Sequence, residues 1–278
     1  MTHVLERVCE GMIFRIARFF GNTPLVRSIF DLIGAAAFSR QMRLVHNGHE
    51  LVFATPNSLN RFRVRTFSLK EPETLVWIDE FNRGDVLWDI GANIGLYTCY
   101  AAKARGCVVV SFEPSIFNLE ILGRNIFANK LQQLVTIIPL PLSKETRVDH
   151  LSLSNISWGG AMSTFKENYG YDGRRLPVVF SYQTAGVAID ESIEKLKLEK
   201  PTHVKIDVDG IEHLILIGGI KTLESVESVL VEINEEFLEQ KGKAEKVLLD
   251  SGLHFVEKHP LEDSNAGPCL LFNQLWKR

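Results

Sequence analysis

The stretch from Val86 to Thr98, VLWDIGANIGLYT, constrains the fold of this chain more than any other. An apolar run ends in an acid, Asp89, and a turn with two glycines then leads into a helical pattern. This is the order of strand, tight loop and helix N-terminus that opens a nucleotide-binding α/β sheet. Gly91 and Gly95 permit positive φ angles and a close approach of the backbone to a ligand.

The rest of the chain continues the alternation of strand and helix. Further strands are expected at residues 107–114, 134–143, 202–210, 228–234, 254–259 and 268–276. The last two are expected to form an antiparallel pair, and two prolines place the strand at 134–143 toward a sheet edge. The sequence therefore predicts an α/β fold with a Rossmann-like, doubly wound, mostly parallel sheet of seven strands.

Two regions interrupt this pattern and suggest how the chain is divided. Residues 1–60 are predicted to form an N-terminal extension of helix and hairpin, and residues 61–278 the main domain. Within that domain, residues 144–186 form an insertion with two expected strands, at residues 147–154 and 175–183, and it is expected to cover the substrate side of the sheet.

The predicted N-terminal extension contains a helical part followed by a hairpin. Residues 1–40 are mainly helical and amphipathic, and are expected to pack on the main domain or on a second subunit. For residues 1–20, peripheral contact with a membrane is the alternative. A hairpin is predicted across Asn47-Gly48. The run at 61–69, RFRVRTFSL, is predicted to be a strand with its arginines on one solvated face.

Composition narrows the class of protein. The chain has 278 residues, 45% of them hydrophobic, and a net charge of −3, so it lacks the basic excess of a nucleic-acid binder. No run of 18 apolar residues predicts a transmembrane segment, and the N-terminus does not resemble a signal peptide. Four scattered cysteines without a C-x-x-C pair fit a reducing compartment, so a cytoplasmic location is expected.

The acid at Glu113, 22 positions after Gly91, can accept both ribose hydroxyls of an adenosine. Glu113 by itself does not separate NAD from S-adenosylmethionine. The loop D-I-G-A-N-I-G lacks the G-x-G-x-x-G spacing that binds a pyrophosphate. S-adenosylmethionine has no phosphate but has positive groups that Asp89 can complement. The alternative role for Asp89 is to cap the helix that follows.

Three motifs together resemble the FkbM family of class I methyltransferases. They are D-I-G-A-N-I-G, F-E-P-S-x-x-N-x-x-x-L-x-x-N and K-I-D-V-D-G-x-E, and the resemblance covers roughly residues 61–240. It implies that the cofactor is S-adenosylmethionine and that the reaction methylates hydroxyl groups, often of sugars or secondary metabolites.

The resemblance also implies site residues. The cofactor loop would comprise Asp89, Gly91, Asn93 and Gly95. Glu113 would bind the ribose, and Pro114 and Ser115 would turn the chain beside the adenine. Asn118 matches a position in the following helix, and Leu142 and Ser143 would flank the adenine.

A hydroxyl acceptor must lose its proton, so a base near the end of the fourth parallel strand is expected. The candidate catalytic residues there are Lys205, Asp207 and Asp209. Each has an alternative: Lys205 and Asp207 can form an internal ion pair, and Asp209 with Glu212 can cap the next helix.

Other polar residues near the strand ends have weaker signals. His203 and His213 can act as bases or can be structural, and Glu232 with Asn234 loosely resembles a magnesium site, although no metal is expected. In the insertion, Asn155, Ser157, Trp158 and Ser163 can contact a polar acceptor or belong to a surface loop.

The expected function is O-methylation of a small-molecule or glycan hydroxyl, without nucleic acid as a partner. An oligomer is compatible with this. The alternatives are a NAD-dependent oxidoreductase and a non-catalytic module that binds S-adenosylmethionine. A methyltransferase acting on exocyclic base nitrogens is disfavoured because no N-P-P-Y or D-P-P-Y stretch is present.

Overall fold

The central element of the fold is a seven-stranded sheet, seen in a computed structural model that describes residues 23–261 and 270–278. Its strand order is β11-β12-β10-β9-β3-β4-β5, and every strand except β12 runs in the same direction. The strands are β3 (Val86–Ile90), β4 (Val108–Phe112), β5 (Val135–Ile138), β9 (His203–Ile206), β10 (Ser228–Asn234), β11 (His254–Pro260) and β12 (Leu271–Lys277). The predicted Rossmann-like fold, the edge position of β5 and the antiparallel terminal pair are confirmed.

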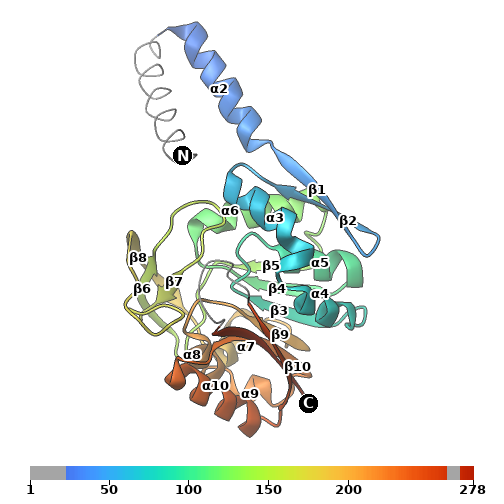
Figure 1. Cartoon of the computed structure of the whole chain (residues 1–278), viewed down its shortest axis with the longest axis vertical. Helices are drawn as coiled ribbons and strands as arrows, with labels where there is room; N and C mark the ends of the chain where they lie inside the picture. Colours follow the sequence, from blue (N-terminus) through green and yellow to red (C-terminus); the bar gives the residue numbers. More distant parts are fainter. Residues whose placement is uncertain (1–22, 262–269) are drawn as a thin grey trace.

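Helices cover both faces of this sheet (Figure 1). One face packs against α3 (Ser58–Lys70), α4 (Pro72–Asp79), α5 (Leu96–Tyr100) with its π-helical extension η1 (Ala101–Arg105), and α6 (Ile116–Ala128). The other face packs against α7 (Ile189–Leu196), α8 (Glu212–Ile217), α9 (Ile220–Leu223) and α10 (Leu238–Asp250).

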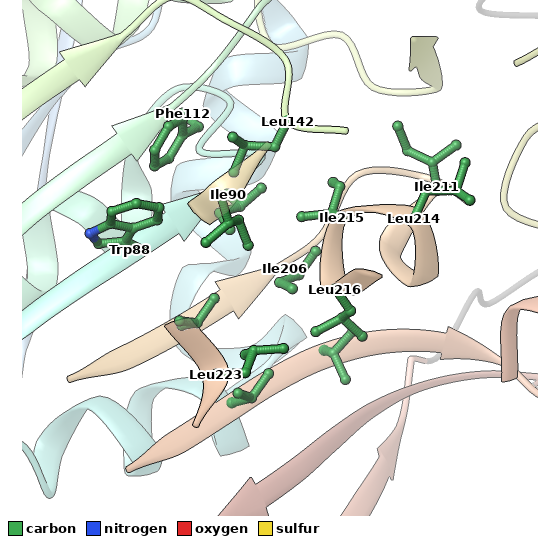
Figure 2. Packing of buried hydrophobic residues seen from close by; sticks show 14 of the residues in the cluster. Trp88, Ile90, Phe112, Leu142, Ile206, Ile211, Leu214, Ile215, Leu216 and Leu223 are labelled. Atoms are coloured by element: carbon green, nitrogen blue, oxygen red, sulfur yellow. The ribbon is translucent and has the colours of Figure 1, made fainter. Parts of the chain in front are cut away.

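The alternation of side chains along β3 decides which residues face which layer. Trp88 and Ile90 point into the cluster shared with α8 and α9, where Figure 2 shows them beside Phe112 and Ile206. Leu87 points to the opposite cluster. Asp89 lies on the same side as Leu87, so its carboxylate faces α3 and α5 and not the layer of α7–α10.

The N-terminal part contains the predicted hairpin, formed by β1 (Gln41–His46) and β2 (His49–Ala54). Asn47 and Gly48 have φ angles of 45° and 80°, as a two-residue hairpin turn requires. Before it, α2 (Pro24–Phe38) projects from the body at the top of Figure 1 and has no buried residue. The membrane contact predicted for residues 1–20 lies outside the described residues. None of the described helices is long and apolar enough to cross a bilayer.

The strand predicted at residues 61–69 is wrong, because this run belongs to helix α3. The Asn57 side chain accepts a hydrogen bond from the Asn60 backbone N–H (2.8 Å) and caps the helix. Val64 and Phe67, three residues apart, bury its inner face. The arginines recur every second residue, which is the period of a strand. In a helix, however, residues two apart are turned by about 200° about the axis. The arginines therefore do not share one face.

The insertion forms a second sheet of three antiparallel strands, in the order β7-β6-β8. These are β6 (Arg147–Leu153), β7 (Ser163–Phe165) and β8 (Phe180–Gly186). Two strands were predicted here. The second of them begins at Phe180, later than predicted, and β7 was not foreseen because it has only three residues. The division of the chain into residues 1–60 and 61–278 stays a prediction.

Candidate active site

A first cavity of about 60 Å³ lies at the carboxyl ends of the parallel strands. This is the edge of the sheet where open α/β folds bind ligands. Of the residues expected to bind the cofactor or flank its adenine, those that line it are Gly91, Asn93, Glu113, Pro114, Asn118 and Leu142. Asp207 and Asp209 line it as well. Ser115 instead precedes α6, and the Ser143 backbone N–H donates to the Val187 carbonyl (3.0 Å).

Glu113 follows β4 and is the acid best placed in this cavity. Its Oε2 accepts a hydrogen bond from the Asn93 N–H (2.7 Å), and its Oε1 accepts one from the Ser115 N–H (2.8 Å). Burial raises the pKa of this carboxyl to about 7, while these two N–H groups act in the opposite direction. The carboxylate still has acceptor capacity for ribose hydroxyls, since it offers about four lone-pair sites.

Residues 157–163 of the insertion, here called the clasp segment, close over the first cavity. Asn118 binds it twice: its Oδ1 accepts from the Gly159 N–H (2.9 Å) and its Nδ2 donates to the Gly160 carbonyl (3.0 Å). Asn93 Nδ2 donates to the same carbonyl (2.8 Å). Two residues expected to bind the cofactor therefore also hold the clasp segment.

Helix α3 and the end of β9 hold the clasp segment from outside. Asn57 Nδ2 donates to the Trp158 carbonyl (2.9 Å), and Arg63 Nε donates to the Gly159 carbonyl (2.8 Å). From the other side, Asp209 Oδ2 accepts from the N–H groups of Met162 (2.7 Å) and Ser163 (3.3 Å). The insertion was expected to contact the acceptor, and in the structure its residues Gly160, Ala161 and Ser163 line the first cavity.

Asp89 is buried and bonded within the protein. Its Oδ2 accepts from the Thr98 hydroxyl (2.5 Å), which also bonds the Ser111 hydroxyl (2.8 Å). Burial raises the pKa of Asp89, and the nearby charge of Lys205 opposes this effect. Asp89 thus contacts Thr98 in the first turn of α5 through both its hydroxyl and its backbone N–H, as expected for the alternative role of supporting this helix start.

Gly91 is required where the loop meets the end of β9. Its φ is +87°, and a Cβ placed on it would lie 1.9 Å from the backbone oxygen of Asp207. A side chain at this position would force β3 and the residue after β9 apart. The close approach that the sequence predicted for this glycine is therefore made to the protein's own backbone.

The three residues predicted to be catalytic separate into two groups. Lys205 Nζ lies 2.8 Å from Asp207 Oδ2, so the internal ion pair considered for them is present. Burial acts to raise the pKa of Asp207, but Lys205 overcomes this and holds it below its usual value. Asp209 binds the clasp segment and does not cap α8. Burial and the charge of Asp207 raise the pKa of Asp209 to about 6.

The turn that precedes α8 is held by the Glu212 side chain instead. Its carboxylate accepts from the backbone N–H groups of Val208 (3.2 Å) and Gly210 (3.1 Å), and from the Gln240 amide. Burial raises the pKa of Glu212 to about 7. Of the pair considered for capping, only Glu212 therefore supports this turn, and it does so by reaching backward along the chain.

A second cavity of about 210 Å³ lies between α3 and the ends of β3 and β9. It shares Gly91, Asn93 and Asp207 with the first cavity, so the two adjoin. Its wall includes polar side chains and aromatic rings: Arg63, Lys70, Glu71, Asp89, Lys205, Phe62 and Tyr97. Sequence reasoning missed Lys70 and Glu71, and left Arg63 on a solvated face, because it predicted a strand where α3 lies.

The comparisons with known proteins agree with this geometry. The model of the methyltransferase FkbM domain matches residues 89–259. The chain belongs to the FkbM methyltransferase family. It is 27% identical over 190 residues to the hexuronic acid methyltransferase AglP of Haloferax volcanii, which covers 68% of this chain and 72% of that protein.

Solved structures are more distant. Methyltransferase FkbM from Methylobacillus flagellatus KT is 15% identical with a TM-score of 0.48, over 72% of this chain and 44% of that chain. TYW2 of M. jannaschii, solved with AdoMet, is 13% identical with a TM-score of 0.46, over 86% of each chain.

Family membership makes the chain an S-adenosylmethionine-dependent methyltransferase, and the oxidoreductase and non-catalytic alternatives are not favoured. The residues of the first cavity fit this cofactor. Asn93 Oδ1 and Thr164 Oγ1 are buried there without a hydrogen-bond partner among the described residues. Each such atom costs about 1–3 kcal/mol unless a polar ligand or water meets it. The cavity, at about 60 Å³, is smaller than the roughly 300 Å³ of ordinary ligand pockets.

The remaining polar residues lie away from both cavities. His203 begins β9 at the opposite edge of the sheet, where its ring stacks on Phe81 with centroids 3.8 Å apart. Burial lowers the pKa of His213 to about 4, and neither histidine lines a cavity. Burial also raises the pKa of Glu232. Within residues 23–261 and 270–278, no group of three or more acidic, histidine or cysteine side chains is arranged to hold a metal ion.

The insertion residues that were expected to contact the acceptor lie in different surroundings. Trp158 packs against Phe38 at the end of α2, with ring centroids 4.8 Å apart. Asn155 Oδ1 accepts from the Ser157 N–H (2.8 Å) within an exposed turn. Of these residues only Ser163 lines the first cavity.

Proposed function

We propose that this enzyme transfers a methyl group from S-adenosylmethionine to an oxygen of a sugar, in a glycan or a smaller saccharide. The observation that carries the proposal is the shared wall of the two cavities, formed by Gly91, Asn93 and Asp207. An acceptor in the second cavity would meet a cofactor in the first across these residues. The similarity to a hexuronic acid methyltransferase supports a sugar as the acceptor.

The cofactor, when bound, supplies a methyl group on a positively charged sulfur. In this proposal Glu113 accepts the ribose hydroxyls, while Pro114, Asn118 and Leu142 border the adenosine. The free oxygen of Asn93 accepts a proton donor of the cofactor, such as its ammonium group. Asp89 adds negative charge beside the loop. The chief contribution of these residues is alignment, because methyl transfer is an in-line displacement.

Deprotonation of the acceptor falls to the acids after β9. Asp207 lines both cavities, so its carboxylate can accept the proton of the hydroxyl whose oxygen bonds to the methyl carbon. Lys205 is a positioning residue, because its ammonium fixes the Asp207 carboxylate and keeps it charged. Asp209 is the second candidate base. Its pKa of about 6 is better matched to neutral pH, but its Oδ2 already accepts two N–H bonds of the clasp segment.

The test is transfer of an isotope-labelled methyl group from S-adenosylmethionine to neutral and acidic methyl glycosides, read by mass spectrometry. Calorimetry with S-adenosylhomocysteine and NADH accompanies it. We expect label on the sugar and binding of S-adenosylhomocysteine that Asp89→Ala and Glu113→Ala abolish. Tight binding of NADH without S-adenosylhomocysteine would contradict the proposal.

The role of Asp207 has its own test. Asp207→Asn is expected to lower turnover by about a hundredfold, within the range that general bases contribute, while the affinity for S-adenosylhomocysteine changes less than about threefold. Glu120→Gln is the control, because Glu120 pairs with Arg124 on the exposed side of α6. Unchanged turnover in Asp207→Asn would remove this residue from the mechanism. A cytoplasmic location and an oligomeric state stay predictions.

A further inference from the structure

The positively charged side chains around the second cavity differ in whether a carboxylate pairs with them. Lys205 pairs with Asp207 at 2.8 Å, and Lys70 pairs with Glu71 at 3.0 Å. Arg63 has one hydrogen bond, from its Nε to the Gly159 carbonyl, and no described carboxylate lies within 4 Å of it. Its two terminal amino groups therefore form no hydrogen bond or ion pair among residues 23–261 and 270–278, while its charge acts on the nearby carboxylates of Asp207 and Asp209.

The placement of Arg63 suits an anion that enters from solvent. The Nε bond to the clasp segment fixes the guanidinium plane at the cavity wall. A fixed guanidinium presents parallel N–H groups that match the two oxygens of a carboxylate. Lys70 follows seven residues later, two turns along the same face of α3, and adds positive charge at the cavity rim.

The rest of the wall suits a ligand with an apolar face. Phe62 and Tyr97 present aromatic rings to the cavity, and Phe62 is 59% exposed although it is a large apolar side chain. The carboxylates of the wall do not repel an anion strongly. Asp207 and Glu71 are paired with lysines, and Asp89 is bonded to Thr98.

From this we propose that Arg63, supported by Lys70, binds a carboxylate group in the second cavity. The inference rests on the proposed function, and two ligands of the reaction can supply that group. One is an acidic sugar acceptor, whose carboxylate would meet Arg63 while its ring packs on the aromatic wall. The other is the α-carboxylate at the amino-acid end of the cofactor, which would reach across the shared wall.

The test compares each carboxylate probe with a partner that lacks the carboxylate. Methyl β-D-glucuronide is paired with methyl β-D-glucoside, each titrated in the presence of S-adenosylhomocysteine. S-adenosylhomocysteine itself is paired with methylthioadenosine, which lacks the amino-acid part. The variants are Arg63→Gln, Arg63→Lys and the control Arg65→Gln, since Arg65 is exposed on another side of the same helix.

We expect Arg63→Gln to weaken one of the two carboxylate probes at least tenfold and to leave its neutral partner within twofold. Arg63→Lys is expected to restore part of that loss, and Arg65→Gln to change nothing. Loss confined to the glucuronide assigns the carboxylate to the acceptor, and loss confined to S-adenosylhomocysteine assigns it to the cofactor.

Two results would overturn the inference. One is unchanged affinity for both carboxylate probes in Arg63→Gln. The other is an equal loss for methylthioadenosine, which would mean that the variant acts only through the clasp segment. Thermal unfolding of each variant separates these results from misfolding. Failure of the wild-type enzyme to bind S-adenosylhomocysteine would instead contradict the proposed function.

Discussion

Gly91 and Gly159 lie in two segments that line the first cavity, the loop after β3 and the clasp segment, and both have the left-handed backbone that favours glycine, with φ of +87° and +82°. Their surroundings differ. A Cβ on Gly91 would meet the backbone oxygen of Asp207 at 1.9 Å, between two central strands. A Cβ on Gly159 would meet the side-chain oxygen of Asn60 at 2.1 Å, between a loop and a helix. Backbone at the ends of paired central strands cannot shift to relieve a clash with an added Cβ, whereas a side chain or a loop can.

The difference extends to how the two walls are built. The loop after β3 continues directly from that strand and turns at glycines with positive φ angles. It packs against the end of β9, the strand paired with β3. The clasp segment is held through its backbone by side chains from distant parts of the chain, namely Asn57, Arg63, Asn93, Asn118 and Asp209. Both walls therefore depend on the completed fold, the first through backbone contacts between neighbouring strands and the second through side chains that bind the backbone of a loop.

The largest expected effect is that of Gly91→Ala. The clash with β9 and the positive φ should cost at least about 3 kcal/mol, since left-handed strain alone costs about 1–2. Chemical denaturation measures the loss. The control is Gly123→Ala in α6, where nothing lies within 4 Å, and it should be neutral or stabilise by up to about 1 kcal/mol. Equal stability of the two variants would contradict the rigid wall described for β3.

The ion pair beneath Gly91 tests the same wall from the β9 side. Lys205→Met leaves Asp207 without its partner in a mostly buried site, and should destabilise the fold by roughly 3 kcal/mol. The double variant Lys205→Met with Asp207→Leu should be more stable than the single one, because it removes the uncompensated charge. Unfolding free energies of the wild type, of the single variants Lys205→Met and Asp207→Leu, and of the double variant give the coupling. Additive losses would show that the two side chains do not interact.

Gly159→Ala tests the clasp segment. We expect a global loss of about 1–2 kcal/mol, the usual strain of a left-handed alanine, and faster amide exchange confined to residues 157–163. The loop at residues 91–95 should keep its protection. Exchange that rises equally in both places would mean that the two walls unfold together. Ser157→Ala, at an exposed position, is the control.

The smallest expected effect is a pH dependence through Glu113, whose carboxylate binds the loop after β3 through the Asn93 N–H. Its pKa is about 7 in the free protein, so the carboxyl is protonated below that pH. Ribose hydroxyls favour the charged form, so cofactor binding should release a proton. Affinity for S-adenosylhomocysteine should therefore fall about tenfold from pH 8 to pH 6. Calorimetry in two buffers measures the released proton. In Glu113→Gln this dependence should disappear, and its persistence would assign the proton to another group, such as Asp209.

Much of the fold was accessible from the sequence because parallel strands are long apolar runs that end in polar residues. β3, β4, β9 and β10 were all found this way. The strand predicted in place of α3 failed for a physical reason. A period of two in the arginines competed with a helical period in the buried positions, and burial decided the outcome. The cap at Asn57 was the signal that could have found the helix.

The sequence alone indicated the cofactor class, because the loop after Asp89 lacks the spacing of a pyrophosphate site and three motifs together resemble the FkbM family. Only the tertiary structure decided the partners of these residues. It placed the Asp209 carboxylate on the clasp segment and Arg63 at the second cavity. Such contacts join residues up to about a hundred positions apart, and the spacing of residues along a chain does not encode contacts of that range.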